Sequence, residues 1–343
     1  MGWKFTEAAF KDLIVKLKAD YTILGPKRFV GQGRFSDTDL IRYDEIESLD
    51  EIVWNEKSTF SPKEVVFPIT QTLFYFIEEK FLEPKLDENK ILIFLRPCDI
   101  NGIRRLDTIH LRNGPQSDSY YAQLRERVRF VMMECMEGFD TCFCVSMKSN
   151  ITSDYDMAVR FGDDEVLAEV KNDDFTRYFS LDLPRVEFTP GFVQENTIKV
   201  TVPDGGEISA GIYNHDMWNE YKSRCIACGR CNTTCITCSC HTTTDIFYDD
   251  NMRAGERRRT WACCHVDGFT DMAGGISFRK DNGSRMRFKV LHKIYDYNKR
   301  FGEHMCVGCG RCDDNCPEYI SYSSCINRLS QVIQETDACV KIP

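Results

Sequence analysis

The alternation of apolar and polar residues predicts a mixture of helices and strands in the first half of the chain. Apolar positions from Phe10 to Leu17 follow the helical period, and Thr6 can cap this segment, so we expect a helix to about residue 19. Short continuous apolar runs at residues 91–95 and 128–133 have the length and β-branched content of buried strands. The two strands are expected to pair in parallel through a crossover connection.

Other segments complete this pattern. A short helix is expected around residues 122–127, and the aromatic-rich segment after Pro68 predicts a buried helix to about Lys80. Gly31 and Gly33 lack the third glycine of a dinucleotide-binding fingerprint, so we expect a turn or a hairpin there. Short alternating runs further along predict four strands, at residues 158–161, 166–170, 186–188 and 198–202.

Cysteines follow both of the predicted parallel strands. Cys98 and Asp99 come after the first strand, and Cys135 comes after the second. Because open α/β sheets bind ligands at the carboxyl ends of their strands, these side chains should converge with the nearby Cys142 and Cys144. We expect the four cysteines to hold a [4Fe–4S] cluster, which would be the third in the chain after the two predicted from the cysteine runs described next. Asp99 would be an alternative ligand or a hydrogen-bond acceptor. Zinc, or buried free thiols, would also account for four cysteines.

Two cysteine runs of the same spacing dominate the last third of the chain. The first run is Cys225, Cys228, Cys231 and Cys235, and the second is Cys306, Cys309, Cys312 and Cys316. Bacterial-type ferredoxins bind [4Fe–4S] clusters with this spacing, and the fourth cysteine of each run ligates the other cluster. The predicted ligand sets are therefore crossed, with Cys316 joining the first three cysteines and Cys235 joining the second three.

The first run differs from the second in its surroundings. Ile236 stands where the second run has Pro317, so the turn after Cys235 is less constrained. Cys238, Cys240 and Cys264 are close enough in sequence to replace an assigned ligand, and this alternative stays open.

Composition narrows the class of protein. The chain has 343 residues, enough for two domains, and 18 cysteines. No signal peptide or membrane-spanning run stands out, so we expect metal ligands in a reducing cytoplasm rather than disulfides. The net charge of −9 argues against nucleic-acid binding. Residues 253–300 hold twelve Lys or Arg and five Asp or Glu. These cations would either stabilise anionic clusters, or form a solvated surface or a docking patch for an acidic partner.

These patterns predict two domains. Residues 1–215 should form an α/β (α+β) domain that carries the third iron–sulfur site. Residues 216–343 should form a mainly helical, ferredoxin-like domain around the two [4Fe–4S] motifs.

Several longer segments extend this picture. They are residues 35–43, 67–75, 96–99, 141–144, 254–259 and 302–321. Together they resemble the A subunits of anaerobic sulfite reductases over nearly the whole chain. The resemblance implies a hetero-oligomer in which a flavoprotein subunit takes electrons from NADH and a siroheme subunit reduces sulfite to sulfide. This chain would relay electrons between those partners, with no catalytic residues of its own.

Two other classes fit part of the pattern. The iron–sulfur β subunits of soluble nickel–iron hydrogenases, or sulfhydrogenases, share the paired ferredoxin runs and the upstream cysteine segments. A zinc-stabilised interaction module would explain the cysteines without redox chemistry.

Overall fold

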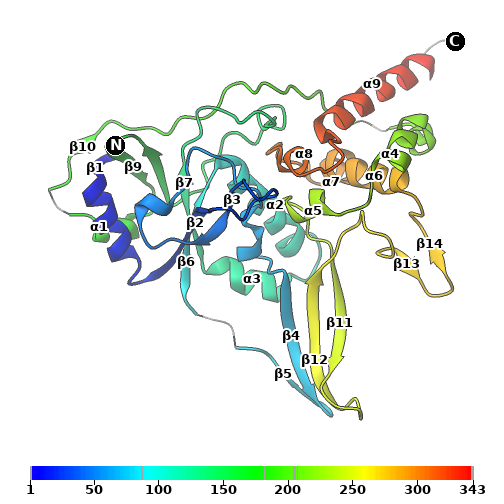
Figure 1. The fold of residues 1–343 in the computed structure, drawn as a ribbon, viewed down its shortest axis with the longest axis horizontal. Helices are drawn as coiled ribbons and strands as arrows, with labels where there is room; N and C mark the ends of the chain where they lie inside the picture. Colours follow the sequence, from blue (N-terminus) through cyan, green and yellow to red (C-terminus); the bar gives the residue numbers. More distant parts are fainter. Residues whose placement is uncertain (1, 86–87, 181, 204–205, 207, 341–343) are drawn as a thin grey trace.

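An eight-stranded mixed sheet forms the centre of the N-terminal part of the molecule (Figure 1). The computed structural model describes residues 2–85, 88–180, 182–203, 206 and 208–340, with side chains as far as residue 336. In spatial order the strands are β10 (Arg185–Val186), β1 (Gly2–Thr6), β9 (Glu165–Val170), β8 (Met157–Phe161), β7 (Val128–Met133), β6 (Lys90–Leu95), β2 (Tyr21–Phe29) and β3 (Leu40–Glu45).

The middle of this sheet is parallel and its flanks are antiparallel. The β2–β6, β6–β7 and β7–β8 pairs are parallel, with Ile91 opposite Val128 and Leu95 opposite Met132. The predicted parallel pair is therefore confirmed, and β6 and β7 end at the same edge. β2 and β3 form the hairpin expected around Gly31, whose φ is +66°.

Successive side chains of β6 point to opposite faces of the sheet and pack into two separate cores. Leu92 and Phe94 pack with the apolar face of α1 (Glu7–Leu17), which Thr6 caps as predicted. Ile93 and Leu95 point to the opposite face and pack with α2 (Pro97–Leu111). The strand is thus buried on both sides, as its continuous apolar run indicates.

The pattern of apolar residues does not predict helix α2, which directly follows β6. Its buried face includes polar side chains that break the apolar period, and distant groups satisfy them. Arg105 donates to the His304 carbonyl at 2.7 Å, and Asp107 accepts from the Tyr121 hydroxyl at 2.7 Å. Tyr121 lies on α3 (Ser119–Glu126), the short helix predicted before β7. Buried polar groups need such hydrogen-bond partners. Because the partners are distant in sequence, the local pattern of apolar residues does not predict that these polar side chains are buried.

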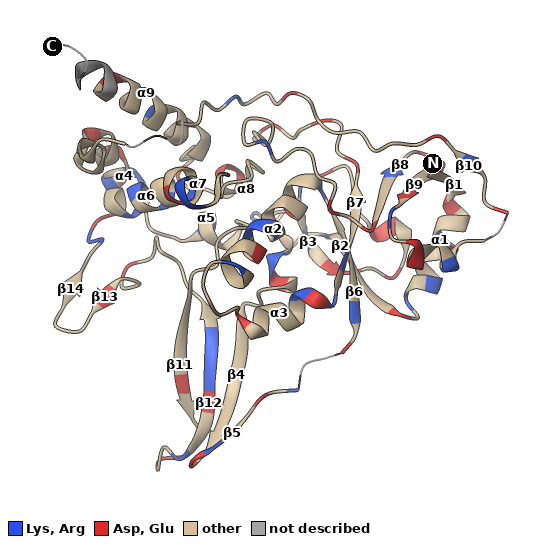
Figure 2. Cartoon of the chain, turned by 180° about the vertical axis from the view of Figure 1, so that it is seen from behind, with Lys and Arg blue, Asp and Glu red and all other residues tan. Residues whose placement is uncertain are grey.

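A second sheet of four strands extends away from the body (Figure 1). Its order is β11 (His241–Phe247), β12 (Ala254–Trp261), β4 (Thr70–Ile77) and β5 (Lys80–Leu82). The helix predicted after Pro68 is wrong, because this segment pairs as β4 with β12, placing Thr70 opposite Thr260. Arginines run along β12 (Figure 2), and Arg257 pairs with Asp245 on β11 at 2.7 Å.

The strand predicted at residues 198–202 does not form. Its backbone instead bonds to side chains from two other segments. The Val200 amide donates to Ser146 Oγ at 3.0 Å, and the Thr201 amide donates to Asn327 Oδ1 at 2.8 Å. These contacts satisfy the extended segment without a neighbouring strand.

The C-terminal part mixes helices with strands. Its helices are α4 (Asn219–Arg224), α5 (Arg230–Thr233), α6 (Asn282–Leu291), α7 (Tyr297–Phe301), α8 (Arg311–Asp314) and α9 (Tyr322–Val340), with a π-helical turn at His292–Asp296. The hairpin β13 (Asp271–Met272) and β14 (Ile276–Ser277) also lies here, with β11 and β12. The fold is therefore mixed α/β, and a mainly helical C-terminal part is not confirmed.

The two halves of the sequence share their packing. One core joins Phe143 and Val200 to Trp218 and Ile326, and another joins Ile100 to Val307. A domain boundary near residue 215 stays a proposal. Within the described residues, no helix has both the length and the apolar content needed to cross a bilayer.

Candidate iron–sulfur sites

The two cysteine runs fold into loops of the same shape. Ala227 and Gly308 occupy equivalent positions with φ of +56° and +64°, and Gly229 and Gly310 follow with φ of +75° and +73°. The left-handed positions turn each loop so that an amide points at its first cysteine. The amide of Gly308, for example, donates to Cys306 Sγ at 3.4 Å. Each loop then enters a short helix, α5 or α8.

Packing also constrains both glycines. A Cβ on Gly229 would lie 3.2 Å from Cys263 Sγ, and one on Gly310 would lie 2.3 Å from the Thr141 carbonyl oxygen. Glycine is therefore required at position 310 for space as well as for its φ.

The first predicted ligand set comes together around one cavity. Its lining includes Cys225, Cys228, Cys231 and Cys316, and also Cys312 of the second set. Cys316 belongs to the second run, so the structure brings it to the first loop as the crossed assignment expects. Four thiols around one space suit a [4Fe–4S] cluster, which takes four cysteine thiolates. Cys228 is exposed, and the other three are partly buried.

The second predicted set lies deeper. Cys306 and Cys309 are buried, and Cys312 is partly buried. Burial raises the pKa of the Cys306 thiol to about 12, and the nearby Cys235 contributes to that rise. Cys235 acts in the same direction on the pKa of Cys309. Cys235 therefore lies beside the second loop, again as the crossed assignment expects. Loading a cluster here must displace protons that these thiols hold firmly at neutral pH.

The four upstream cysteines also meet. Cys98 begins α2, Cys135 follows β7, and Cys142 and Cys144 lie on the next loop. Burial, with Cys142 and Cys135 nearby, raises the pKa of Cys144 to about 12. Burial, Asp99 and Cys144 raise the pKa of Cys98. The sheet edge and the loop thus bring together the four thiols proposed for a third cluster, and their donor chemistry fits one.

Asp99 is occupied by an ion pair instead of being free to ligate. Its two oxygens accept from Arg311 Nη1 at 2.5 Å and Nη2 at 2.9 Å, and both residues are almost completely buried. Arg311 belongs to the second cysteine loop, and Asp99 is adjacent to Cys98. The pair therefore connects the upstream site with the second ferredoxin-type site.

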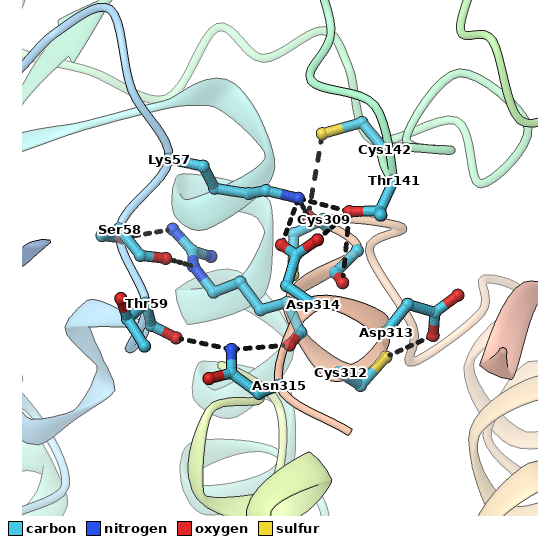
Figure 3. Close-up of polar contacts among 12 residues, drawn as sticks. Lys57, Ser58, Thr59, Thr141, Cys142, Cys309, Cys312, Asp313, Asp314 and Asn315 are labelled. Carbon is cyan, nitrogen blue, oxygen red and sulfur yellow. Dashed lines mark hydrogen bonds and ion pairs between the residues drawn. The ribbon is translucent and has the colours of Figure 1, made fainter. Parts of the chain in front are cut away.

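The same two sites also contact each other directly, and Figure 3 shows the contacts made by Cys142 and Lys57. The Phe143 amide donates to the Gly308 carbonyl at 2.8 Å, and the Cys142 thiol donates to the Cys309 carbonyl at 3.7 Å. Lys57 adds a bridge, because its ammonium contacts Thr141 Oγ1 and Asp314 Oδ2, each at 2.5 Å. The upstream loop thus packs directly on the second cysteine loop.

Two buried lysines lie beside the ferredoxin-type sites. Lys293 Nζ is 3.5 Å from Cys235 Sγ, and Lys289 Nζ is 3.2 Å from the Cys231 carbonyl oxygen. Burial alone would lower the pKa of Lys293, but Cys235, Cys238 and Cys306 raise it above its ordinary value. Burial likewise opposes the charge of Lys289, but Cys231, Cys312 and Cys238 raise its pKa above the ordinary value. Both lysines lie in the basic segment noted from the sequence, which does not by itself show which of its cations face the thiols.

No three His, Cys, Asp or Glu side chains in the described ranges are close enough to hold a single metal ion. A zinc site would need its ligands around one point. The choice between iron and zinc at the upstream cysteines stays open to metal analysis.

Two loops of one shape, each surrounded by cysteine thiols, define a protein with paired iron–sulfur sites. Comparison agrees, because residues 224–320 match the 4Fe-4S dicluster domain family. The chain is also similar to sulfhydrogenase 2 subunit beta of Pyrococcus furiosus, with 25% identity over 345 residues that cover 94% of this chain and 96% of the relative. No solved structure gives a significant match.

These comparisons confirm the general resemblance found in the sequence. The chain is related to iron–sulfur electron-transfer subunits, and it contains the predicted dicluster domain. The narrower resemblance to sulfite reductase is not confirmed, since the relative belongs to the second class that shares these motifs. The third cluster and the individual ligands stay predictions.

Replacing Arg311 tests the link between the sites. Arg311→Met leaves the Asp99 carboxylate buried without its partner, so the protein should lose about 3–5 kcal/mol of stability in anaerobic denaturant unfolding. Arg230 occupies the equivalent position in the first loop and is exposed, so Arg230→Met is the control and should change stability little. Equal stability of the two variants would contradict a connecting role for the pair.

Replacing Cys316 tests the crossed ligand sets. If Cys316 ligates the first cluster, the EPR spectrum of reduced Cys316→Ala should change in the same signals as that of Cys228→Ala. A spectrum that instead matches Cys309→Ala would show that Cys316 ligates the second cluster.

Proposed function

We propose that this chain is the iron–sulfur electron-transfer subunit of a hetero-oligomeric oxidoreductase of the soluble hydrogenase or sulfhydrogenase kind. The observation that carries the proposal is that three sets of four cysteines follow one another through the protein, beginning at the surface. The first set reaches the surface at Cys228, and the buried second set lies against the upstream set through Gly308 and Phe143. Bound [4Fe–4S] clusters would supply one-electron transfer at these places. The similarity to the sulfhydrogenase subunit supports this choice of complex.

The protein's own residues would set the properties of each site. Burial of Cys306 and Cys309 excludes water from the second set. Lys289 and Lys293 place two positive charges beside anionic thiolate sites, which favours the reduced, more negative state and raises the potential. Arg311 and Asp99 position the second loop and the start of α2. None of these groups needs to exchange a proton with a substrate.

The upstream cysteine set offers a second place where a partner could exchange electrons with this chain. A cavity of about 390 Å³ lies beside the upstream set, and its lining includes Cys135, Trp54 and Arg96. We therefore propose that electrons pass between this face and the surface near Cys228. Both ends would meet partner subunits, since no nicotinamide or flavin motif is evident in the sequence.

The four-stranded sheet supports the proposal of a hetero-oligomer. Its outer end exposes a group of large apolar side chains, Ile77, Phe81, Leu82, Phe247, Tyr248 and Met252. Grouped apolar side chains on a surface are typical of sites where proteins associate.

A second candidate is the A subunit of an anaerobic sulfite reductase. The matches at residues 35–43, 67–75, 254–259 and 302–321 favour it over a general hydrogenase subunit. The partners would then be an NADH-oxidising flavoprotein and a siroheme subunit. A cytoplasmic location is proposed for either complex.

Purification of the tagged chain with its partners, under anaerobic conditions from the natural host, distinguishes the candidates. We expect iron and acid-labile sulfide in this chain and nickel in a copurifying partner. Siroheme absorption in place of nickel would reject the hydrogenase proposal in favour of sulfite reductase. A colourless chain with zinc and no sulfide would contradict both.

Cys135→Ala tests whether the upstream site takes part in the relay. The assembled variant should lose turnover driven by the physiological donor by at least tenfold, while a dye that acts directly on the catalytic partner still supports turnover. Cys325→Ala is the matched control, because Cys325 is buried but belongs to none of the three sets. Normal donor-driven turnover by a folded, assembled Cys135→Ala complex would contradict an obligatory relay.

A further inference from the structure

Three cysteines outside the assigned sets line one additional cavity. Cys238, Cys240 and Cys264 share a space of about 450 Å³ with residues of α6, α7 and the π-helical turn between them. Cys238 and Cys264 are buried, and Cys240 is partly buried. These residues come from the segment after the first cysteine run and from the loop that follows β12, so the fold brings them together from separate places.

The thiols have surroundings that favour metal binding over simple packing. Cys240 and Cys264 contact each other through their side chains. The Asn232 amide donates to Cys264 Sγ at 3.0 Å, which stabilises the thiolate form. The Ala262 amide donates to the Cys240 carbonyl at 2.9 Å and fixes the two segments side by side.

The rest of the cavity wall combines apolar and aromatic side chains with four cations. Lys289 and Lys293, both about 3% exposed, line it together with Arg279 and Arg300. Arg279 Nη1 is buried and has no hydrogen-bond partner among the described residues. Asp296 is the one acidic residue in the lining, and it is exposed. This space therefore suits an anionic group that also binds thiols.

We propose that Cys238, Cys240 and Cys264 hold a fourth iron–sulfur cluster, of the [4Fe–4S] type, in this cavity. Thiolates are soft ligands that select iron–sulfur clusters, zinc or copper(I). A single ion is disfavoured because no three of these side chains gather around one point in the described structure. A thiolate-ligated cluster is larger and anionic, and the four cations of the wall would offset its charge.

The fourth site is distinct from the two ferredoxin-type sites. Each of those has four cysteines in the proposed sets, with Cys316 and Cys235 contributed by the opposite run, and Cys238 lies against Cys235 where the sites adjoin. Three thiols are one fewer than a [4Fe–4S] cluster usually takes, so one iron would be ligated by a group other than cysteine. This inference goes beyond the proposed electron relay and does not depend on the identity of the complex.

Counting iron and acid-labile sulfide in the full-length chain after anaerobic reconstitution tests the proposal. Cys264→Ala and Cys240→Ala should each contain about four fewer irons and sulfides than the wild type. Cys325→Ala, which removes a buried thiol away from the cavity, should keep the wild-type content. Unchanged iron in a folded Cys264→Ala or Cys240→Ala protein, or the loss of zinc in place of iron, would overturn the proposal.

A combined variant separates a new site from ligand exchange within an old one. The pair Cys225→Ala and Cys228→Ala empties the first ferredoxin-type set, and adding Cys264→Ala should remove about four further irons. If the added substitution removes none, Cys264 serves the first cluster and the fourth site is rejected. Should Cys264→Ala fail to fold, the same combination with Cys240→Ala decides, because Cys240 is less buried.

Discussion

The buried ion pair between Arg311 and Asp99 determines how the cysteine loops meet the sheet. Asp99 also accepts from the Tyr43 hydroxyl at 3.3 Å, and Arg311 also donates to the Ser58 carbonyl at 3.0 Å. Hence β3, the segment before β4, α2 and the second cysteine loop converge on one bidentate contact. Burying two charges is costly, and an apolar pair can give equal stability. The ion pair contributes geometric specificity, because a bidentate contact forms in only one relative orientation of the two segments.

Positive charge is concentrated inside a chain that is acidic overall. The net charge is −9, yet Lys63, Lys289, Lys293 and Arg311 are all buried. Lys63 illustrates how such a cation is held, because its ammonium donates to the Asn232 and Cys238 carbonyls at 3.1 and 2.9 Å. Thiolate-bound clusters are anionic, so buried cations would offset the charge of the clusters even though the chain as a whole is acidic. The three lysines are held by carbonyls or thiols of the first cysteine run and the residues that follow it, whereas Arg311 is held by the Asp99 carboxylate and the Ser58 carbonyl.

The sequence predicts those parts of the structure whose causes are local. The cap at Thr6, the parallel strands β6 and β7, and the paired cysteine loops all follow from spacing and period. Strand β4 does not, because β12, the partner that makes it a strand, lies 177 to 190 residues further along the chain. The cluster-facing cations were predictable only as a basic segment. Which of them point inward depends on helix packing around the loops, and no short motif reports that.

The pairing of β4 with β12 also affects how the chain can be made. β4 can pair early with β5 through its last residues, Tyr75 to Ile77, but its other edge must wait until residue 261 has been synthesised. During that time an aromatic strand presents an unpaired edge, a known route to aggregation. The first cysteine run lies between the two partner strands in sequence, so closing the sheet also closes the long loop that contains this run. Synthesis and sheet closure are therefore linked in time, and the first cysteine run reaches its final surroundings only after residue 261 has been made.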